Sequence, residues 1–358
     1  MRQKTLHKDK SLSQKFVCRF CGSDQLVLRF SLKVKNNGRQ KLYCKACQKD
    51  AYPAVKQKKR KRKPRDWHAY NNQLKRRGAF DLCISMEDWN AELAGMNRKK
   101  NGHPFIYPKI LVNIGMAVRF TQHFPYRQEE GFLGELVLKF SAFPAVPSYT
   151  QLCRRINDAM KSSKNALAIR AMSKWKEEDI LAVDSTGIKV YNRGEWIRHK
   201  HKVRRGWLKL HIAVNGKGEA IIAEVTEEDE GDGEVFDRTI APQLKKLKPT
   251  RVPLDMGYDK NSIFDAIGEA GADPVIPPRD GATTKCKSKF RRKVVKEMIG
   301  MGYKPWSEKH KHGERWVNEG YFSAFKGTFG EYVVSHKSEN MVNELYAKVL
   351  ILQELREM

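Results

Sequence analysis

The stretch ILAVDSTGIKVY, residues 180–191, starts as an apolar strand and turns polar at Asp184. Aliphatic and β-branched residues in such a short run favour a half-buried strand. We predict that this strand leaves the core and presents Asp184 at its end or just inside it. Asp255 follows the apolar run RVPL in the same way. Strand ends hold side chains on rigid backbone within reach of solvent, so both aspartates are candidate functional residues.

Further strand and helix patterns follow this stretch. The runs WLKLHIAVN and EAIIAEVTE are the next two strand candidates, separated by polar and Gly-containing turns. A helix after Asp232, the strand RVPLDMG, the helix NSIFDAIGEAG, the strand DPVIPP and a long basic helical region complete the chain. The order βββαβαβα predicts an α/β domain over residues 176–358.

The length and composition fit a folded protein of two or three domains. The chain has 358 residues, of which 40% are hydrophobic, enough to fill a sizeable core. No apolar run reaches the roughly 18 residues of a membrane span, and the N-terminus lacks the apolar centre of a signal peptide. We therefore expect a cytoplasmic protein with no membrane partner.

Basic residues outnumber acidic ones, with 69 Lys and Arg against 41 Asp and Glu and a formal net charge of +28. Residues 1–65 alone contain 21 Lys and Arg against 3 Asp. A basic surface gains affinity for nucleic acid by releasing condensed counterions. The charge therefore predicts double-stranded DNA as the partner. The run KQKKRKRKPR is assigned to a basic linker over residues 56–66.

Four of the seven cysteines lie at metal-ligand spacing near the N-terminus. Cys18 and Cys21 form one C-x2-C pair, and Cys44 and Cys47 form another, with 22 residues between the pairs. The spacing predicts a zinc ribbon over residues 1–55, with one structural Zn2+ held by four thiolates and a hairpin around NNG. Disulfides are the alternative, which a cytosolic setting disfavours. The ribbon binds either DNA, which we favour, or protein.

Residues 67–175 carry a helical pattern, with apolar residues at helical spacing between Ile110 and Val118. After the run AFPAVPS, Ser148 and Gln151 fit a capping box. A helix, a Pro-bounded turn and a basic helix fit either a helix-turn-helix unit that binds DNA or a plain helical bundle.

A third carboxylate candidate, Glu319, lies in a helical pattern between two cations. At about 100° per residue, Arg315, Glu319 and Lys326 project from one stripe of the helix. Carboxylates from two strand ends and a helix can hold two Mg2+ ions about 3.5–4 Å apart, one activating the attacking oxygen and the other stabilising the leaving oxygen. Arg315 and Lys326 would then position a DNA strand through its phosphates.

Two charged runs between the strands receive simpler interpretations. RHKHKVRR, with Lys200 and Arg204, is interpreted as a phosphate-contacting face and not as a metal site, and Lys189 before it is a further phosphate contact. The acidic run EVTEEDEGDGEVFD is interpreted as a solvated turn. Asp232 and Glu234 would lie at a helix N-terminus, where the helix dipole favours anions.

The motifs VDSTGIKVYNRGEW, DMGYD followed by VIPPR, and the spacing R-x3-E-x6-K of Arg315, Glu319 and Lys326 resemble the DDE transposases of bacterial and archaeal insertion sequences. The resemblance runs from residue 75 to the C-terminus and includes FPYRQEEGFLGELV and VPSYTQLCRR. It implies a ribonuclease H-like, retroviral integrase-type catalytic fold, which agrees with the strand order above.

The resemblance also implies a reaction and its residues. Water would nick DNA at the element's end with Mg2+ or Mn2+, and the freed 3′-OH would attack target DNA. Asp184, Asp255 and Glu319 match the catalytic triad and metal ligands, and Arg315 and Lys326 match the basic positions. The family further implies a homodimer or larger synaptic assembly on element ends and target DNA in a prokaryotic cell.

This chain departs from the family pattern in two places, and two other functions fit its residues. His312 stands where the family usually has Tyr, and an N-terminal cysteine unit is not typical of it. A domesticated DNA-binding protein would regulate without cutting, but three carboxylates beside phosphates would then only repel. A metal-dependent nuclease would cleave without joining, so strand-transfer products separate it from a transposase.

Overall fold

A computed structural model of the protein describes most of the chain from residue 86 onward and short pieces before it. The described residues are 16–17, 26–28, 42–44, 46–48, 50–51, 54–55, 66–68, 71–72, 75, 86–139, 145–176, 179–190 and 206–357. The chain divides into two compact units, Met1–Trp67 and His68–Met358. None of the helices in these ranges is long and apolar enough to cross a membrane.

The first unit contains short antiparallel strands. The described strands are β1 (Phe16–Val17), β2 (Leu26–Leu28), β3 (Leu42–Cys44), β4 (Asp50–Ala51) and β5 (Ala54–Val55). β2, β3 and β4 form one sheet in that order, and β1 pairs with β5. The runs before and after NNG pair as antiparallel strands, whereas the predicted turn at NNG lies outside the described residues.

The described part of the second unit begins with helices, of which the last before the sheet is the longest. They are α2 (Met86–Asn97), α3 (Lys109–Gln122), α4 (Tyr126–Lys139) and α5 (Tyr149–Lys174). The predicted capping interaction is present at the start of α5, where the Ser148 N–H donates to Gln151 Oε1 at 3.2 Å. α5 packs against α3 and α4 and then continues past β8 and α13 (Ser338–Glu357). It thus joins the helical region to the sheet.

The sheet of the second unit is built around β6 (Ala182–Val190). β7 (Trp207–Val214) pairs antiparallel with β6, and β8 (Ala220–Glu227) pairs antiparallel with β7. β9 (Arg251–Pro253) and β10 (Asp273–Val275) form a parallel pair. A parallel bridge between Ile180 and Arg251 connects β9 to the chain just before β6. The strands therefore follow the order β8-β7-β6-β9-β10.

Helices cover both faces of this sheet because its strands alternate between two cores. Ala182, Ile188 and Val190 of β6 pack with residues of α3, α5, α13 and α12 (Trp316–Phe329). Val183 packs on the other face with residues of α8 (Ala241–Leu247) and α9 (Asn261–Glu269). Successive side chains of a strand point to opposite faces, which produces this division.

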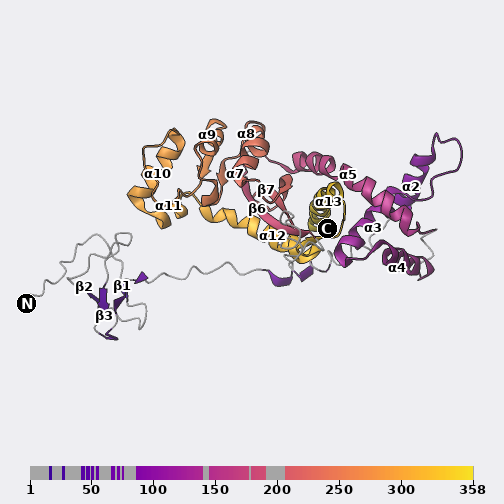
Figure 1. The fold of residues 1–358 in the computed structure, drawn as a ribbon, viewed down its shortest axis with the longest axis horizontal. Coiled ribbons are helices and arrows are strands. Elements are labelled where there is room, and N and C mark those ends of the chain that lie inside the picture. The colour runs from indigo at the N-terminus through magenta and orange to yellow at the C-terminus, as the bar shows by residue number, and fades with distance from the viewer. Residues whose placement is uncertain are drawn as a thin grey trace, which may run out of the picture. The chain divides into compact units, whose positions relative to one another are not determined.

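Shorter elements connect the main ones. α7 (Asp232–Val235) continues through a π-helical turn η2 (Phe236–Ile240) into α8, and the 3-10 turn η3 (Met256–Tyr258) follows β9. α10 (Lys289–Met301) lies next to α9, and α11 (Tyr303–Lys309) lies next to α10 (Figure 1). The 3-10 turn η4 (His312–Arg315) leads into α12.

Two sequence predictions need correction here. The strand does not end at Asp184, which is its third residue, because β6 keeps pairing with β7 as far as Lys189. Residues 184–187 are only partly buried, and they still belong to the strand. The change from apolar to polar residues at Asp184 therefore does not mark the end of β6. In addition, β11 (Tyr332–Val333) interrupts the predicted C-terminal helical region and pairs parallel with the end of β6.

Candidate active site

Asp184 and Asp255 come to the same edge of the sheet. Ile180 and Arg251 form the parallel bridge, and Asp184 follows Ile180 by four residues, as Asp255 follows Arg251. Leu181 N–H also donates to Arg251 O at 3.1 Å, which fixes the register of the two segments. Because parallel chains advance in the same direction, the two aspartates lie beside each other, as their placement after similar apolar runs suggested.

Asp184 lies in an environment that disfavours its charge. Its side chain is 25% exposed. Burial raises the pKa of its carboxyl above the usual range, and the nearby carboxylates of Asp255 and Asp232 act in the same direction. The Ser185 N–H, which donates to Asp184 Oδ1 at 2.9 Å, and the Arg315 guanidinium oppose this increase in pKa.

Arg315 lies between Asp184 and Glu319. Its Nη1 is 3.6 Å from Asp184 Oδ2, and its Nη2 donates to Glu319 Oε1 at 2.8 Å. Arg315 ends η4 and Glu319 lies in the first turn of α12, so the ion pair spans four residues along one helix stripe. The predicted alignment of these two side chains is therefore present.

The basic residues Lys189 and Lys326 meet elsewhere. Lys189 Nζ lies 3.7 Å and Lys326 Nζ lies 3.6 Å from opposite carboxylate oxygens of Glu331. Lys189 is the last β6 residue paired with β7, whereas Lys326 is in the last turn of α12. A shared acidic partner thus holds two of the predicted phosphate contacts near each other.

The three predicted carboxylates do not converge in the described part of the chain. No three His, Cys, Asp or Glu side chains there form a ligand set for a metal ion. Glu319 is 55% exposed and is held by Arg315, so a cation already separates it from Asp184. Carboxylates repel one another, and a guanidinium between two of them offsets that repulsion.

His312 connects the Glu319 and Asp255 segments through its ring. Its Nε2 lies 2.9 Å from the carbonyl oxygen of Leu254, the residue before Asp255. Because a carbonyl only accepts, Nε2 carries the proton, and Nδ1 faces the Tyr303 hydroxyl at 3.4 Å. The ring is buried, and burial lowers the pKa of His312. The His312 side chain is thus buried and holds η4 against the residue before Asp255.

Asp232 is a residue whose surroundings the sequence interpretation missed. It begins α7, as expected, but it also accepts a hydrogen bond from Ser185 Oγ at 2.9 Å and pairs with Lys209 Nζ at 3.0 Å. His211 Nδ1 lies 3.6 Å from the same oxygen. The available signal was the alternation of β7, which places Lys209 and His211 on one face of a largely buried strand.

Tyr258 lies within the same group of carboxylates. Its hydroxyl is buried and has no hydrogen-bond partner among the described residues. Burial raises the pKa of this phenol well above its usual value, and the charges of Asp232, Asp184 and Asp255 add to the effect. The Tyr258 phenol is therefore a neutral O–H group beside three carboxylates, without an acceptor in the described part of the chain.

Several predicted residues cannot be placed. Lys200 and Arg204 lie outside the described residues, as do Cys18 and Cys21. Cys44 is the last residue of β3, and Cys47 lies in the turn that follows it. The structure therefore does not test the zinc ligands or the phosphate-contacting face.

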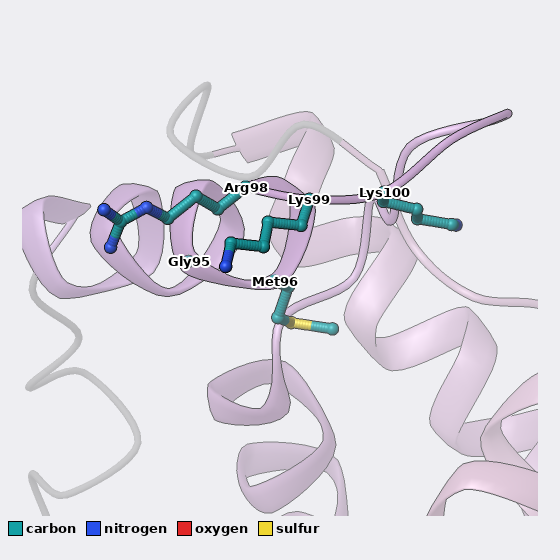
Figure 2. A pocket seen from close by; sticks show the side chains of 5 residues that line it. All are labelled: Gly95, Met96, Arg98, Lys99 and Lys100. Atoms are coloured by element: carbon teal, nitrogen blue, oxygen red, sulfur yellow. The ribbon is translucent and has the colours of Figure 1, made fainter.

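A hollow of about 410 Å3 lies at the end of α2. Its lining residues are Gly95, Met96, Arg98, Lys99 and Lys100, and the three basic side chains extend from the turn after the helix (Figure 2). Cations are favoured near a helix C-terminus by the helix dipole. The hollow contains neither a carboxylate nor a nucleophile, so the carboxylate edge of the sheet remains the candidate active site.

Residues 175–353, half of the chain, match the family described as transposase DDE domain. This region contains Asp184, Asp255 and Glu319. The chain belongs to the transposase DDE domain family. A second match of the same description covers residues 75–193, which include the helical region. The protein is thus a DDE transposase, an enzyme of DNA transposition, and enzymes of this family use divalent metal ions.

Two solved structures of Mos1 transposase are also similar to this transposase. The first, its catalytic domain with raltegravir and Mg, shows 12% identity and a TM-score of 0.20, covering 56% of this chain and 91% of that chain. The second, a paired-end complex with the left transposon end, shows 11% identity and a TM-score of 0.20, covering 80% of this chain and 95% of that chain.

Proposed function

We propose that this transposase cuts DNA at the ends of its own insertion sequence and joins the freed 3′-OH to target DNA. Asp184, Asp255 and Glu319 are the proposed catalytic triad. The observation that carries the proposal is the meeting of Asp184 and Asp255 at one sheet edge, with Arg315 linking that edge to Glu319. A catalytic fold of the ribonuclease H-like type is supported by the strand order β8-β7-β6-β9-β10.

The residues at this edge fit a divalent metal ion. All candidate donors are oxygens, which suit the hard cations Mg2+ and Mn2+. Burial and two neighbouring carboxylates disfavour the charge on Asp184, and a cation would relieve both effects. Asp184, Asp255 and Glu319 would hold two such ions, which activate an attacking oxygen and stabilise a leaving oxygen.

The side chains of the protein have defined tasks in this proposal. Arg315 exchanges its contact with Glu319 for a DNA phosphate, because guanidinium groups bind phosphate as well as carboxylate. Glu319 is then free to turn toward Asp184. Lys326 and Lys189 hold the DNA backbone beyond it, with Lys200 and Arg204 as further phosphate contacts.

The other parts of the chain are proposed to bring DNA to the site. Residues 1–55 form the zinc ribbon with Cys18, Cys21, Cys44 and Cys47 around one Zn2+, and residues 56–66 are a basic linker. β3 and the turn after it, which carry Cys44 and Cys47, support this assignment. The helical region 67–175 binds DNA next to the catalytic domain 176–358. A homodimer or larger synaptic assembly brings two element ends together.

The test is a cleavage and joining assay on linear DNA that carries the element's own ends, with Mg2+ or Mn2+. We expect wild type and Glu269→Gln, a control on the exposed end of α9, to yield 3′-OH ends and joined products. Asp184→Asn and Asp255→Asn should bind the DNA but lose at least about 100-fold in cleavage rate, since the metal ligands are removed. Cleavage without joining would instead identify a nuclease, and binding without cleavage by wild type would identify a DNA-binding regulator.

A further inference from the structure

Residues 279–296, here called the basic segment, follow β10 and form most of α10. The segment contains eight Lys and Arg residues and a single acidic residue, Asp280. Seven of the basic side chains are exposed: Arg279, Lys285, Lys287, Lys289, Arg292, Lys293 and Lys296. The eighth, Arg291, is half-buried. None of these residues was among the sequence-predicted phosphate contacts.

The helical part of the basic segment carries its charges on one stripe. Lys289, Arg292, Lys293 and Lys296 recur at helix positions i, i+3, i+4 and i+7, and all four are exposed. Val294 and Val295 bury the opposite side of α10. The stripe therefore faces away from the core.

This charge pattern does not serve the stability of α10. Cations near a helix N-terminus oppose the helix dipole, and Lys289 and Arg292 lie in the first turn. Like charges four residues apart also repel, as in Lys289 with Lys293 and Arg292 with Lys296. Among the described residues, no carboxylate pairs with any of the four. A bound polyanion would offset both the unfavourable interaction with the helix dipole and the repulsion between the cations.

A buried carboxylate ties the basic segment to the turn that carries Asp255. Asp259, whose side chain is 1% exposed, accepts hydrogen bonds from Arg291 Nε at 2.6 Å and Arg291 Nη2 at 2.9 Å. It also accepts one from the backbone N–H of Arg279 at 2.9 Å. Burial opposes the ionisation of Asp259, but these hydrogen bonds and the arginine charges hold its pKa below the usual value.

A second contact fixes the start of the basic segment. Arg279 Nη2 donates to the carbonyl oxygen of Gly257, two residues after Asp255. The segment is therefore held against residues 257–259 at its first residue, Arg279, and at Arg291 within α10. Residues 257–259 follow Asp255 by two to four positions, so the contacts connect the segment to the turn that begins at Asp255.

We propose that the basic segment is a DNA-binding surface that contacts the phosphate backbone of duplex DNA next to the bond that is cut. The position of the cut rests on the proposed function, whereas DNA binding by the basic segment does not depend on it. One exposed helix stripe with four cations offers several charge contacts to the phosphates of one DNA segment. Asp259 is the residue that positions this surface relative to Asp255.

The test compares the salt dependence of DNA binding for Lys289→Gln/Lys293→Gln with that of the control Lys245→Gln/Lys246→Gln on α8. Binding is measured without added Mg2+ or Mn2+, so that catalysis does not enter and the proposed zinc ribbon keeps its metal. Two lost phosphate contacts should reduce the slope of log K against log salt by about 1.8 and weaken binding about 10-fold or more at 0.1 M salt. The control should keep the wild-type slope.

The outcomes separate the two proposals. An unchanged slope in Lys289→Gln/Lys293→Gln, with the melting temperature at or above that of wild type, would overturn the DNA-binding surface. The melting temperature serves as the folding control, because neutral glutamines remove repulsion within α10. A reduced slope in a protein whose wild type never cuts DNA would support the surface and refute the proposed cleavage.

Discussion

Asp184 combines a central position with an unfavourable environment. It is the third residue of a well-paired strand, yet its carboxyl is largely buried beside Asp255 and Asp232. Functional sites commonly contain groups that reduce the stability of the fold. The raised pKa of Asp184 is consistent with such a site.

Asp184→Asn should stabilise the folded protein at neutral pH when no Mg2+ or Mn2+ is added. Because the folded-state pKa of this carboxyl is raised, the folded state releases the proton less readily, and the free energy of unfolding falls as the pH rises through that pKa. Asparagine carries no proton to lose. We expect the free energy of unfolding at pH 7 to increase by about 0.5–2 kcal/mol.

Urea unfolding of both proteins at pH 4 and pH 7 measures this effect. The gap between them should shrink toward the lower pH. A variant that is less stable than wild type at pH 7 would show that Asp184 is a structural residue stabilised by Arg315, and not a destabilised functional group.

His312→Leu should destabilise the connection between η4 and the end of β9. Leucine leaves the Leu254 carbonyl without its buried donor, at a cost of about 1–3 kcal/mol in the free energy of unfolding. His312→Gln retains an N–H donor and should lose less. Hydrogen exchange of residues 252–258 should increase in His312→Leu and much less in His312→Gln. Equal exchange in both variants would mean that the hydrogen bond to Leu254 does not hold this segment.

The sequence identified the candidate site residues, but it did not predict which side chains they contact. Asp184, Asp255 and Glu319 stood out because each follows or lies within a patterned apolar segment. The roles of Asp232, Tyr258 and His312 could not be predicted, because they depend on side chains that meet from separate elements. The place of Asp232 at the start of a helix suggests only a cap, whereas Ser185 and Lys209 also contact it in the fold.

Among the secondary-structure elements, the helices before the sheet contain an unusual buried acid. Glu129 of α4 is fully buried, and neither carboxylate oxygen has a hydrogen-bond partner among the described residues. It faces α3 so closely that a Cβ at Gly115 would lie 2.7 Å from Glu129 Oε1. Burial, opposed by the charge of Arg119, raises the pKa of Glu129 to about 8.

Glu129→Gln should remove a pH dependence of stability. A carboxyl whose folded pKa is raised stabilises the fold fully at low pH, and this contribution is lost as the pH rises from about 4.5 to 8. Relative to wild type, the glutamine variant should therefore gain stability across that range, by on the order of a few kcal/mol. Urea unfolding between pH 5 and pH 9 measures the gap. Parallel curves over this range would contradict a raised pKa.

Elements with long periodic patterns could be predicted, and short ones could not. The patterns of β6 to β8 and of α9 are strong because each is at least eight residues long. β11 has two residues and offers no periodicity, so its place beside β6 was missed. The register of β9 beside the start of β6 depends on the bridge to Ile180 and on the adjacent backbone hydrogen bonds, contacts that local sequence does not encode.

For the whole molecule, charge and fold point to the same substrate. The net charge of +28 favours a polyanion, and the family match makes that polyanion DNA. The acidic edge with Asp184 and Asp255 is an exception within this basic chain. A few carboxylates are tolerated there only if a cation is placed between them and the DNA phosphates.

The most direct test of the central claim is metal rescue of cysteine variants in DNA cleavage. Asp184→Cys and Asp255→Cys replace an oxygen ligand by sulfur, which Mg2+ binds poorly and the softer Mn2+ tolerates better. We predict that both variants are inactive with Mg2+ and regain cleavage with Mn2+, whereas Glu269→Cys cuts equally with either ion. Equal activity of Asp184→Cys with Mg2+ and with Mn2+ would contradict the claim that Asp184 holds the metal.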